Sequence, residues 1–108
     1  REDLAGCLGE LRGRHGGRSA DLVISCFVFS INEIPTLEPN HEVSEIVRIP
    51  LSRLLEPHLQ TSVRYDAAEG MRFPGIFLDK DDERVIWGLT YRFLRQLFSL
   101  LGHQLPAD

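Results

Sequence analysis

The chain has 108 residues, of which 43% are hydrophobic and 26% are charged, which is the size and balance of one small globular domain. The formal net charge of -4 excludes the basic surface of a general nucleic-acid binder, and no apolar run approaches the ~18 residues that cross a bilayer. Cys7 and Cys26 have the spacing of neither a metal knuckle nor a disulfide framework. A reducing, intracellular location is expected, either cytoplasmic or mitochondrial.

The N-terminal third of the chain is predicted to hold one long strand. Residues 1–12 fit either a frayed turn or a strand edge, because Gly6 and Gly9 interrupt the helical spacing of the leucines there. Residues 13–20 are polar and glycine-rich, which is typical of a loop. Residues 22–31 are almost continuously β-branched or aromatic, and this predicts a central strand covered on both faces.

The middle of the chain is rich in proline. Residues 32–40 form a predicted loop, since Pro35 and Pro39 block regular structure. Residues 43–49 alternate between apolar and polar side chains, which predicts a second strand with one wetter face. A short helix over residues 51–56 is expected to open after Pro50 and to end at Pro57.

The C-terminal third is predicted to form a hairpin, a further strand and a long helix. The hairpin pairs residues 61–65 with 71–78 around a polar turn, and the strand at 84–87 follows a charged turn. Thr90 is the expected N-cap of the helix and Gly102 its C-cap. The apolar stripe of this helix comprises Phe93, Leu94, Leu97, Phe98 and Leu101, with Arg92, Arg95 and Gln96 facing outward.

These elements together predict an α+β fold, because several strands are followed by a helix that can pack on a sheet. The sequence contains no internal repeat and no linker. We therefore predict one domain over residues 1–108.

Several classes of catalytic motif are absent from the sequence. The diglycine Gly16–Gly17 is not followed by the lysine of a P-loop, and no serine lies in a Gly-x-Ser-x-Gly elbow. The four histidines are scattered without the i, i+4 spacing of a zinc site. The acidic run at residues 79–83 lacks the pattern of a calcium loop, and we interpret it as a solvated hairpin turn.

Two glutamates, Glu42 and Glu45, are three residues apart and would share a face if the segment were helical. The β-branched residues around them favour a loop that enters a strand, where the two carboxylates can point to different faces. Taken alone, the residues therefore favour a solvated loop carboxylate and a strand-edge charge over a carboxylate pair.

The order of motifs along residues 7–102 resembles the C-terminal half of a Nudix hydrolase of the coenzyme A diphosphatase type. A Leu-Gly-x-Leu segment precedes the apolar strand at 22–31, and a Glu-Val and Pro-Leu segment follows it. An Ile-Trp-Gly-x-Thr segment then opens the last helix. The matching residues are Leu8, Gly9, Leu11, Pro39, Glu42, Val43, Glu45, Pro50, Leu51, Leu54, Ile86, Trp87, Gly88 and Thr90.

This resemblance implies an incomplete Nudix-like mixed sheet with the C-terminal helix packed on it. The family's catalytic box, with its Arg-Glu-x-x-Glu-Glu core, is absent from the 108 residues, and the expected position of the box is before Arg1. The resemblance further implies cleavage of the diphosphate of coenzyme A or a related nucleoside diphosphate derivative, with Mg²⁺ or Mn²⁺ as cofactor. Glu42 is then the one catalytic residue and metal ligand that this chain contributes, and Trp87 and Phe93 are core residues.

The alternative is a non-catalytic Nudix-like fragment that acts as a binding or structural module. Without the box, the chain alone is expected to be inactive. The apolar strand at 22–31 would then lack part of its cover, which predicts an exposed patch and dimerisation or aggregation. The expected partners are a small nucleoside diphosphate derivative or a second copy of the chain, but neither a nucleic acid nor a membrane.

Overall fold

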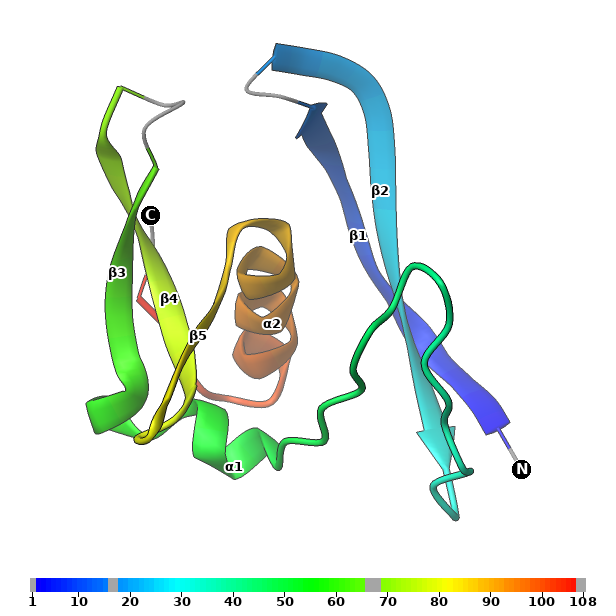
Figure 1. Ribbon diagram of the computed structural model, residues 1–108. Coiled ribbons are helices and arrows are strands. Elements are labelled where there is room, and N and C mark those ends of the chain that lie inside the picture. Colours follow the sequence, from blue (N-terminus) through cyan, green and yellow to red (C-terminus); the bar gives the residue numbers. More distant parts are fainter. Residues whose placement is uncertain (1, 16–17, 66–68, 107–108) are drawn as a thin grey trace.

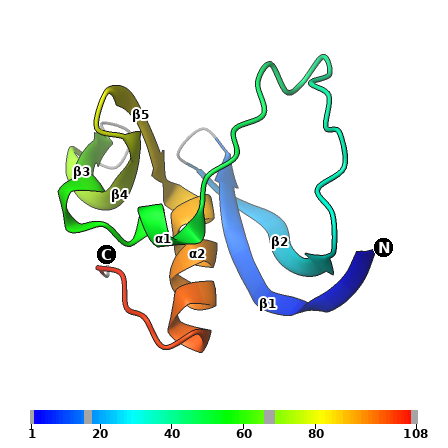
Figure 2. The same ribbon diagram turned by 90° about the horizontal axis from the view of Figure 1, so that it is seen from below.

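The computed structural model describes residues 2–15, 18–65 and 69–106. The strands form two separate sheets, a β1–β2 hairpin and a three-stranded sheet in the order β3–β4–β5, and α2 lies between them (Figure 1 and Figure 2). The α+β prediction is confirmed. The expected mixed sheet is not found, because every strand pair in the described part of the chain is antiparallel. The elements are β1 (Glu2–His15), β2 (Arg18–Ile31), α1 (Leu51–Leu54), the 3-10 turn η1 (Pro57–Leu59), β3 (Gln60–Tyr65), β4 (Met71–Asp79), β5 (Asp82–Trp87) and α2 (Gly88–Leu100).

The hydrophobic core lies between the three-stranded sheet and α2. The predicted hairpin is confirmed, since β3 pairs with β4 from Gln60 opposite Ile76 to Tyr65 opposite Met71, although residues 66–68 of its turn lie outside the described residues. The predicted strand β5 pairs with the other edge of β4. Ile76, on this central strand, is fully buried. The core is formed by Leu54, Leu59, Ile76, Tyr91, Phe98 and Leu105.

The short helix α1 is confirmed but ends earlier than expected, at Leu54. Pro57 begins the η1 turn, because proline's fixed φ suits the first position of a helical turn. The side-chain amide of Gln60 donates to the carbonyl oxygens of Leu54 at 2.8 Å and Glu56 at 3.2 Å. The first bond satisfies the carbonyl of Leu54 at the end of α1, and the second adds to the bond that the Glu56 carbonyl already accepts from the Leu59 amide.

Helix α2 begins at Gly88, two residues before the predicted N-cap. β5 leads into the helix without a loop, and Gly88 adopts a φ of +69°, a left-handed conformation that favours glycine. Trp87 is the N-cap residue and makes no side-chain capping bond. The prediction for Thr90 was wrong, because Thr90 already lies inside the first helical turn and is exposed.

The predicted capping role of Gly102 is confirmed, although the C-cap residue itself is Leu101 and Gly102 is the residue after it. Its φ is +88°, and its amide donates to the Ser99 carbonyl at 3.2 Å while the His103 amide donates to the Phe98 carbonyl at 2.8 Å. These two bonds define a Schellman motif. The imidazole of His103 also packs edge-on against the Phe98 ring, with centroids 6.4 Å apart.

The tail after α2 closes the core. Leu105 is buried, and the Tyr91 hydroxyl donates to the Pro106 carbonyl at 2.7 Å. The predicted apolar stripe did not include Tyr91 or Leu105. It did include Leu101, which is exposed because it lies past the last helical turn.

The N-terminal hairpin is longer than the sequence indicated. Residues 1–12, left open between a turn and a strand edge, lie in β1 from Glu2 onward. The register shifts near Gly6 and Gly9, whose φ values are +159° and +108°, so these glycines mark irregularities of a strand. The loop predicted at 13–20 was wrong for residues 13–15 and 18–20, which extend the two strands, whereas residues 16–17 lie outside the described residues.

The strand predicted at 22–31 is confirmed within β2, but the predicted burial of both its faces is not. β2 pairs with β1 alone in the described residues, so it is not a central strand. Val23, Phe27 and Phe29 are 57%, 57% and 56% exposed, and they share one face because side chains alternate along a strand. The prediction of burial on both faces was therefore wrong for this chain.

The strand predicted at 43–49 is also absent. Residues 32–50 form an irregular loop, with a backbone turn at Asn40–Val43 and a bond from the Arg48 guanidinium to the Pro35 carbonyl at 3.4 Å. The alternation of apolar residues is outweighed because Asn40 bonds to local backbone amides.

Within the described ranges, no helix is long and apolar enough to cross a membrane.

Candidate functional site

Glu42 lies on a turn that the side chain of Asn40 closes. The Asn40 Oδ1 atom accepts hydrogen bonds from the backbone amides of Glu42 and Val43, both at 2.9 Å. The backbone amide of Asn40 donates in turn to the Val43 carbonyl at 2.9 Å. Asparagine favours such turns because its short side chain can replace a backbone acceptor. The backbone of Glu42 is therefore fixed locally, although the loop around it is irregular.

The carboxylate of Glu42 faces solvent, with its side chain 80% exposed. One oxygen lies 3.6 Å from Nε2 of His41, and this contact is an ion pair only when the imidazole is protonated. The structure therefore places an accessible carboxylate on a locally defined turn.

A complete metal centre is not assembled around this turn by the described residues. They contain no group of three or more His, Cys, Asp or Glu side chains that could hold a metal ion. Divalent magnesium takes about six oxygen ligands, and one carboxylate supplies at most two of them. Glu42 can therefore contribute to a magnesium or manganese site only together with ligands from elsewhere.

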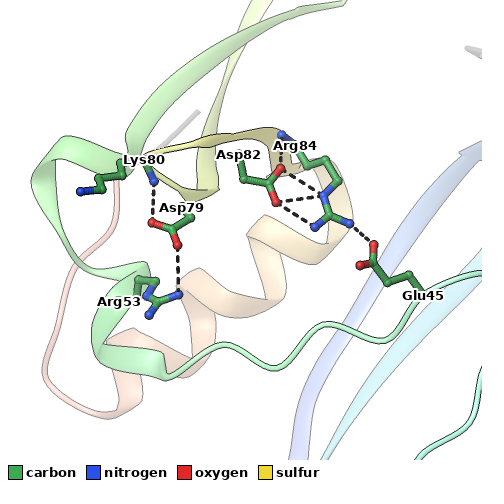
Figure 3. A network of polar contacts seen from close by, with 6 residues as sticks. All are labelled: Glu45, Arg53, Asp79, Lys80, Asp82 and Arg84. Atoms are coloured by element: carbon green, nitrogen blue, oxygen red, sulfur yellow. Dashed lines mark hydrogen bonds and ion pairs between the residues drawn. The ribbon is translucent and has the colours of Figure 1, made fainter.

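Glu45 has a different environment from Glu42. Its carboxylate accepts from Nη1 of Arg84 on β5, and the rest of that guanidinium is bound to Asp82 (Figure 3). The Asp82 carboxylate receives Nε of Arg84 at 3.1 Å and Nη2 at 2.8 Å. Glu42 and Glu45 thus do not form a carboxylate pair. This agrees with the residue pattern, which favoured two separate charges.

The charges in this cluster stabilise one another. The hydrogen bonds donated by the Arg84 side chain and backbone lower the pKa of Asp82 below its ordinary value of 3.8. The hydrogen bonds to Asp82 and Glu45 raise the pKa of Arg84 further above its ordinary value. Both effects favour the charged forms. Sequence reasoning did not single out Arg84, although its spacing of two from Asp82 places both side chains on one face of a strand.

The acidic turn between β4 and β5 is a tight hairpin turn, as predicted. Asp79 pairs with Asp82 across it. Asp79 accepts from the Lys80 amide at 2.7 Å and lies 3.6 Å from Arg53 of α1 (Figure 3). Its carboxylate therefore contacts both the turn and α1 while staying half exposed, in agreement with the interpretation of this run as a solvated hairpin turn.

The core role expected for Phe93 is confirmed, whereas Trp87 is only half-buried and lies outside the core. The Trp87 ring packs against Tyr65 and Phe73 of the sheet, with centroids 5.2 and 6.2 Å apart. Phe93 is buried.

A second feature lies between β1 and α2, where an open hollow of about 590 Å³ is lined by Leu8, Gln96, Ser99 and Gln104, among others. The Oε1 atom of Gln96 is buried there without a hydrogen-bond partner among the described residues. The outward positions predicted for Arg95 and Gln96 were wrong, because both residues line this hollow opposite Leu8 of β1 and each has a buried side-chain atom.

Comparison with known proteins found no matching family model, no matching curated protein and no matching solved structure.

Proposed function

We propose that this chain is part of a metal-dependent hydrolase of the Nudix type, which cleaves the diphosphate of coenzyme A or a related nucleoside diphosphate derivative. The observation that carries the proposal is the exposed carboxylate of Glu42 on a turn fixed by Asn40. The motif order that resembles coenzyme A diphosphatases supports it.

In this proposal, Glu42 is one ligand of Mg²⁺ or Mn²⁺, or the base that accepts a proton from the attacking water. The cation, when bound, offsets negative charge on the diphosphate oxygens. Its other protein ligands come from outside the 108 residues, because Glu42 alone supplies too few oxygens. The chain by itself is therefore expected to be inactive.

The test compares the complete product of the gene that encodes this chain with the 108-residue chain. Each is incubated with coenzyme A and either Mg²⁺ or Mn²⁺, and product is measured. Activity is expected in the complete protein alone. Turnover by the 108 residues at a comparable rate would contradict the proposal that the other metal ligands lie outside them. No turnover by the complete protein would reject the proposed substrate class.

The role of Glu42 is tested by Glu42→Gln in the complete protein. Loss of a metal ligand or base should lower kcat by about 10²-fold or more. Stability should change by no more than ~0.5 kcal/mol, as for other exposed positions. Glu38→Gln, in the same loop and also exposed, is the matched control. An unchanged rate for Glu42→Gln at saturating Mg²⁺ would return Glu42 to the role of a solvated loop residue.

The second candidate is a non-catalytic binding module, and one observation favours it. The β1–β2 hairpin exposes a run of apolar side chains, which on a soluble protein often marks an interaction surface. The partner of this module would be a second copy of the chain. Light scattering of the 108 residues should then show dimers or aggregates, whereas a monomer that unfolds cooperatively would argue against this candidate. The exposed side chains are Leu4, Val23, Phe27, Phe29 and Ile31.

A further inference from the structure

We infer that Arg84 is a positioning residue, which ties the turn bearing Glu42 to the edge of β5 through Glu45. The anchoring itself follows from the geometry of the cluster, and its consequence for catalysis rests on the proposed function of Glu42.

The first step is that Asp82 fixes the direction of the Arg84 guanidinium. Asp82 receives Nε of Arg84 at 3.1 Å on each of its two oxygens and Nη2 at 2.8 Å, so the contact is two-pronged. Its Oδ1 atom also accepts the Arg84 backbone amide at 2.9 Å. A guanidinium held in this way loses little further freedom when it binds a second carboxylate. Its remaining nitrogen, Nη1, is the one that faces Glu45 (Figure 3).

The second step is that the Glu45–Arg84 pair reaches from the loop to the sheet. The other polar bonds of this loop, from Asn40 and from Arg48, end on the loop's own backbone. Glu45 and Arg84, by contrast, are 39 residues apart in the sequence. The pair therefore links the loop to β5, in addition to the packing of Ile49 against the core, while the Asn40 turn sets only the loop's local shape.

Glu42 lies close to this anchor along the chain. Glu42 precedes Glu45 by three residues and is part of the turn that Asn40 holds. Glu45 is the polar contact nearest to this turn that reaches outside the loop. When Glu45 is released, the loop can move and the Asn40 bonds can open more often, which exposes the amides of Glu42 and Val43 to solvent. The side chains of Arg84 and Glu45 are 52% and 58% exposed. An exposed pair contributes little to global stability, so its loss should release the turn without unfolding the core.

The anchor is tested in the complete protein by NMR measurement of solvent exchange at the amides of Glu42 and Val43. Arg84→Gln and Glu45→Gln should each raise these rates by about two- to fivefold, the equilibrium factor expected for one exposed ion pair. The double variant Glu45→Arg with Arg84→Glu should bring the rates back towards the original, since Arg at position 45 can pair with both Glu at 84 and Asp82. Arg53→Gln, which removes the exposed contact with Asp79, is the matched control and should leave the rates unchanged.

Unchanged exchange in Arg84→Gln, or an equal increase in Arg53→Gln, would overturn the anchor. The positioning role is then read from kcat with coenzyme A: Arg84→Gln should lower it by about two- to fivefold with KM little changed, and the double variant should recover it. Faster exchange with unchanged kcat would overturn the positioning role alone. If exchange responds as expected but the unmodified protein has no activity, the anchor stands and the proposed function fails.

Discussion

Phe98→Ala should be among the most damaging substitutions in this chain. Phe98 is 1% exposed and belongs to the core between α2 and the β3–β5 sheet. A fully buried phenylalanine removes about 150–250 Å² from water, which at ~25 cal/mol per Å² corresponds to about 4–6 kcal/mol. Alanine retains part of this burial, so the expected loss is about 3–5 kcal/mol. Domains of this size unfold with about 5–15 kcal/mol, so much of the stability would be lost.

The assay is urea unfolding followed by the fluorescence of Trp87, the single tryptophan of the chain, which packs against Tyr65 in the sheet. Leu100→Ala is the matched control, because Leu100 lies in the same last turns of α2 and is 77% exposed. It should change the free energy of unfolding by about 0.5 kcal/mol or less. Equal losses for the two variants would refute the assignment of the buried face of α2.

Two further predictions concern β4 and β5. Gly75→Ala should lower the free energy of unfolding by about 1–3 kcal/mol in the same assay, because its Cβ would lie 2.6 Å from Cγ1 of Val85 and 3.2 Å from the Ile86 carbonyl oxygen. An unchanged urea midpoint would show that β5 can move aside without loss of stability. Carbon-13 NMR of Asp82 should give a titration midpoint below 3.8, rising in Arg84→Gln. Since the folded pKa is the lower one, this pair stabilises the fold above pH 3.8 and loses its contribution as the pH falls through the lowered value.

The sequence predicted best those elements whose signals are local. The hairpin of β3 and β4, the strand β5 and the Gly102 cap depend on turn residues and on short-range periodicity, and the structure has all of them. Thr90 shows the limit of this reasoning. A threonine before an apolar stripe is a good N-cap, but the glycine at position 88 starts the helix directly from the strand and moves its beginning upstream.

The signals that failed depend on contacts distant in sequence. Residues 22–31 have the composition of a buried strand, but composition cannot supply the neighbouring strands that would bury it. Among the described residues, β2 has only β1 beside it. Residues 43–49 have an alternating pattern, but a strand also needs an edge with which to pair, and the turn at Asn40 offers local bonds instead. Tyr91 and Leu105 became core residues because the tail folds back on α2.

Glu42 and Glu45, two of the four glutamates in the loop at 32–50, have different surroundings that the sequence alone could not distinguish. Glu45 has its charge balanced by Arg84, whose guanidinium is already held by Asp82. A cation at Glu45 would compete with Arg84 for this carboxylate. Glu42 meets no arginine or lysine of this kind in the part of the chain that the structure describes, and its contact with His41 depends on protonation of the imidazole. Of these two carboxylates, Glu42 is therefore the one that a metal ion could bind without competing with an arginine.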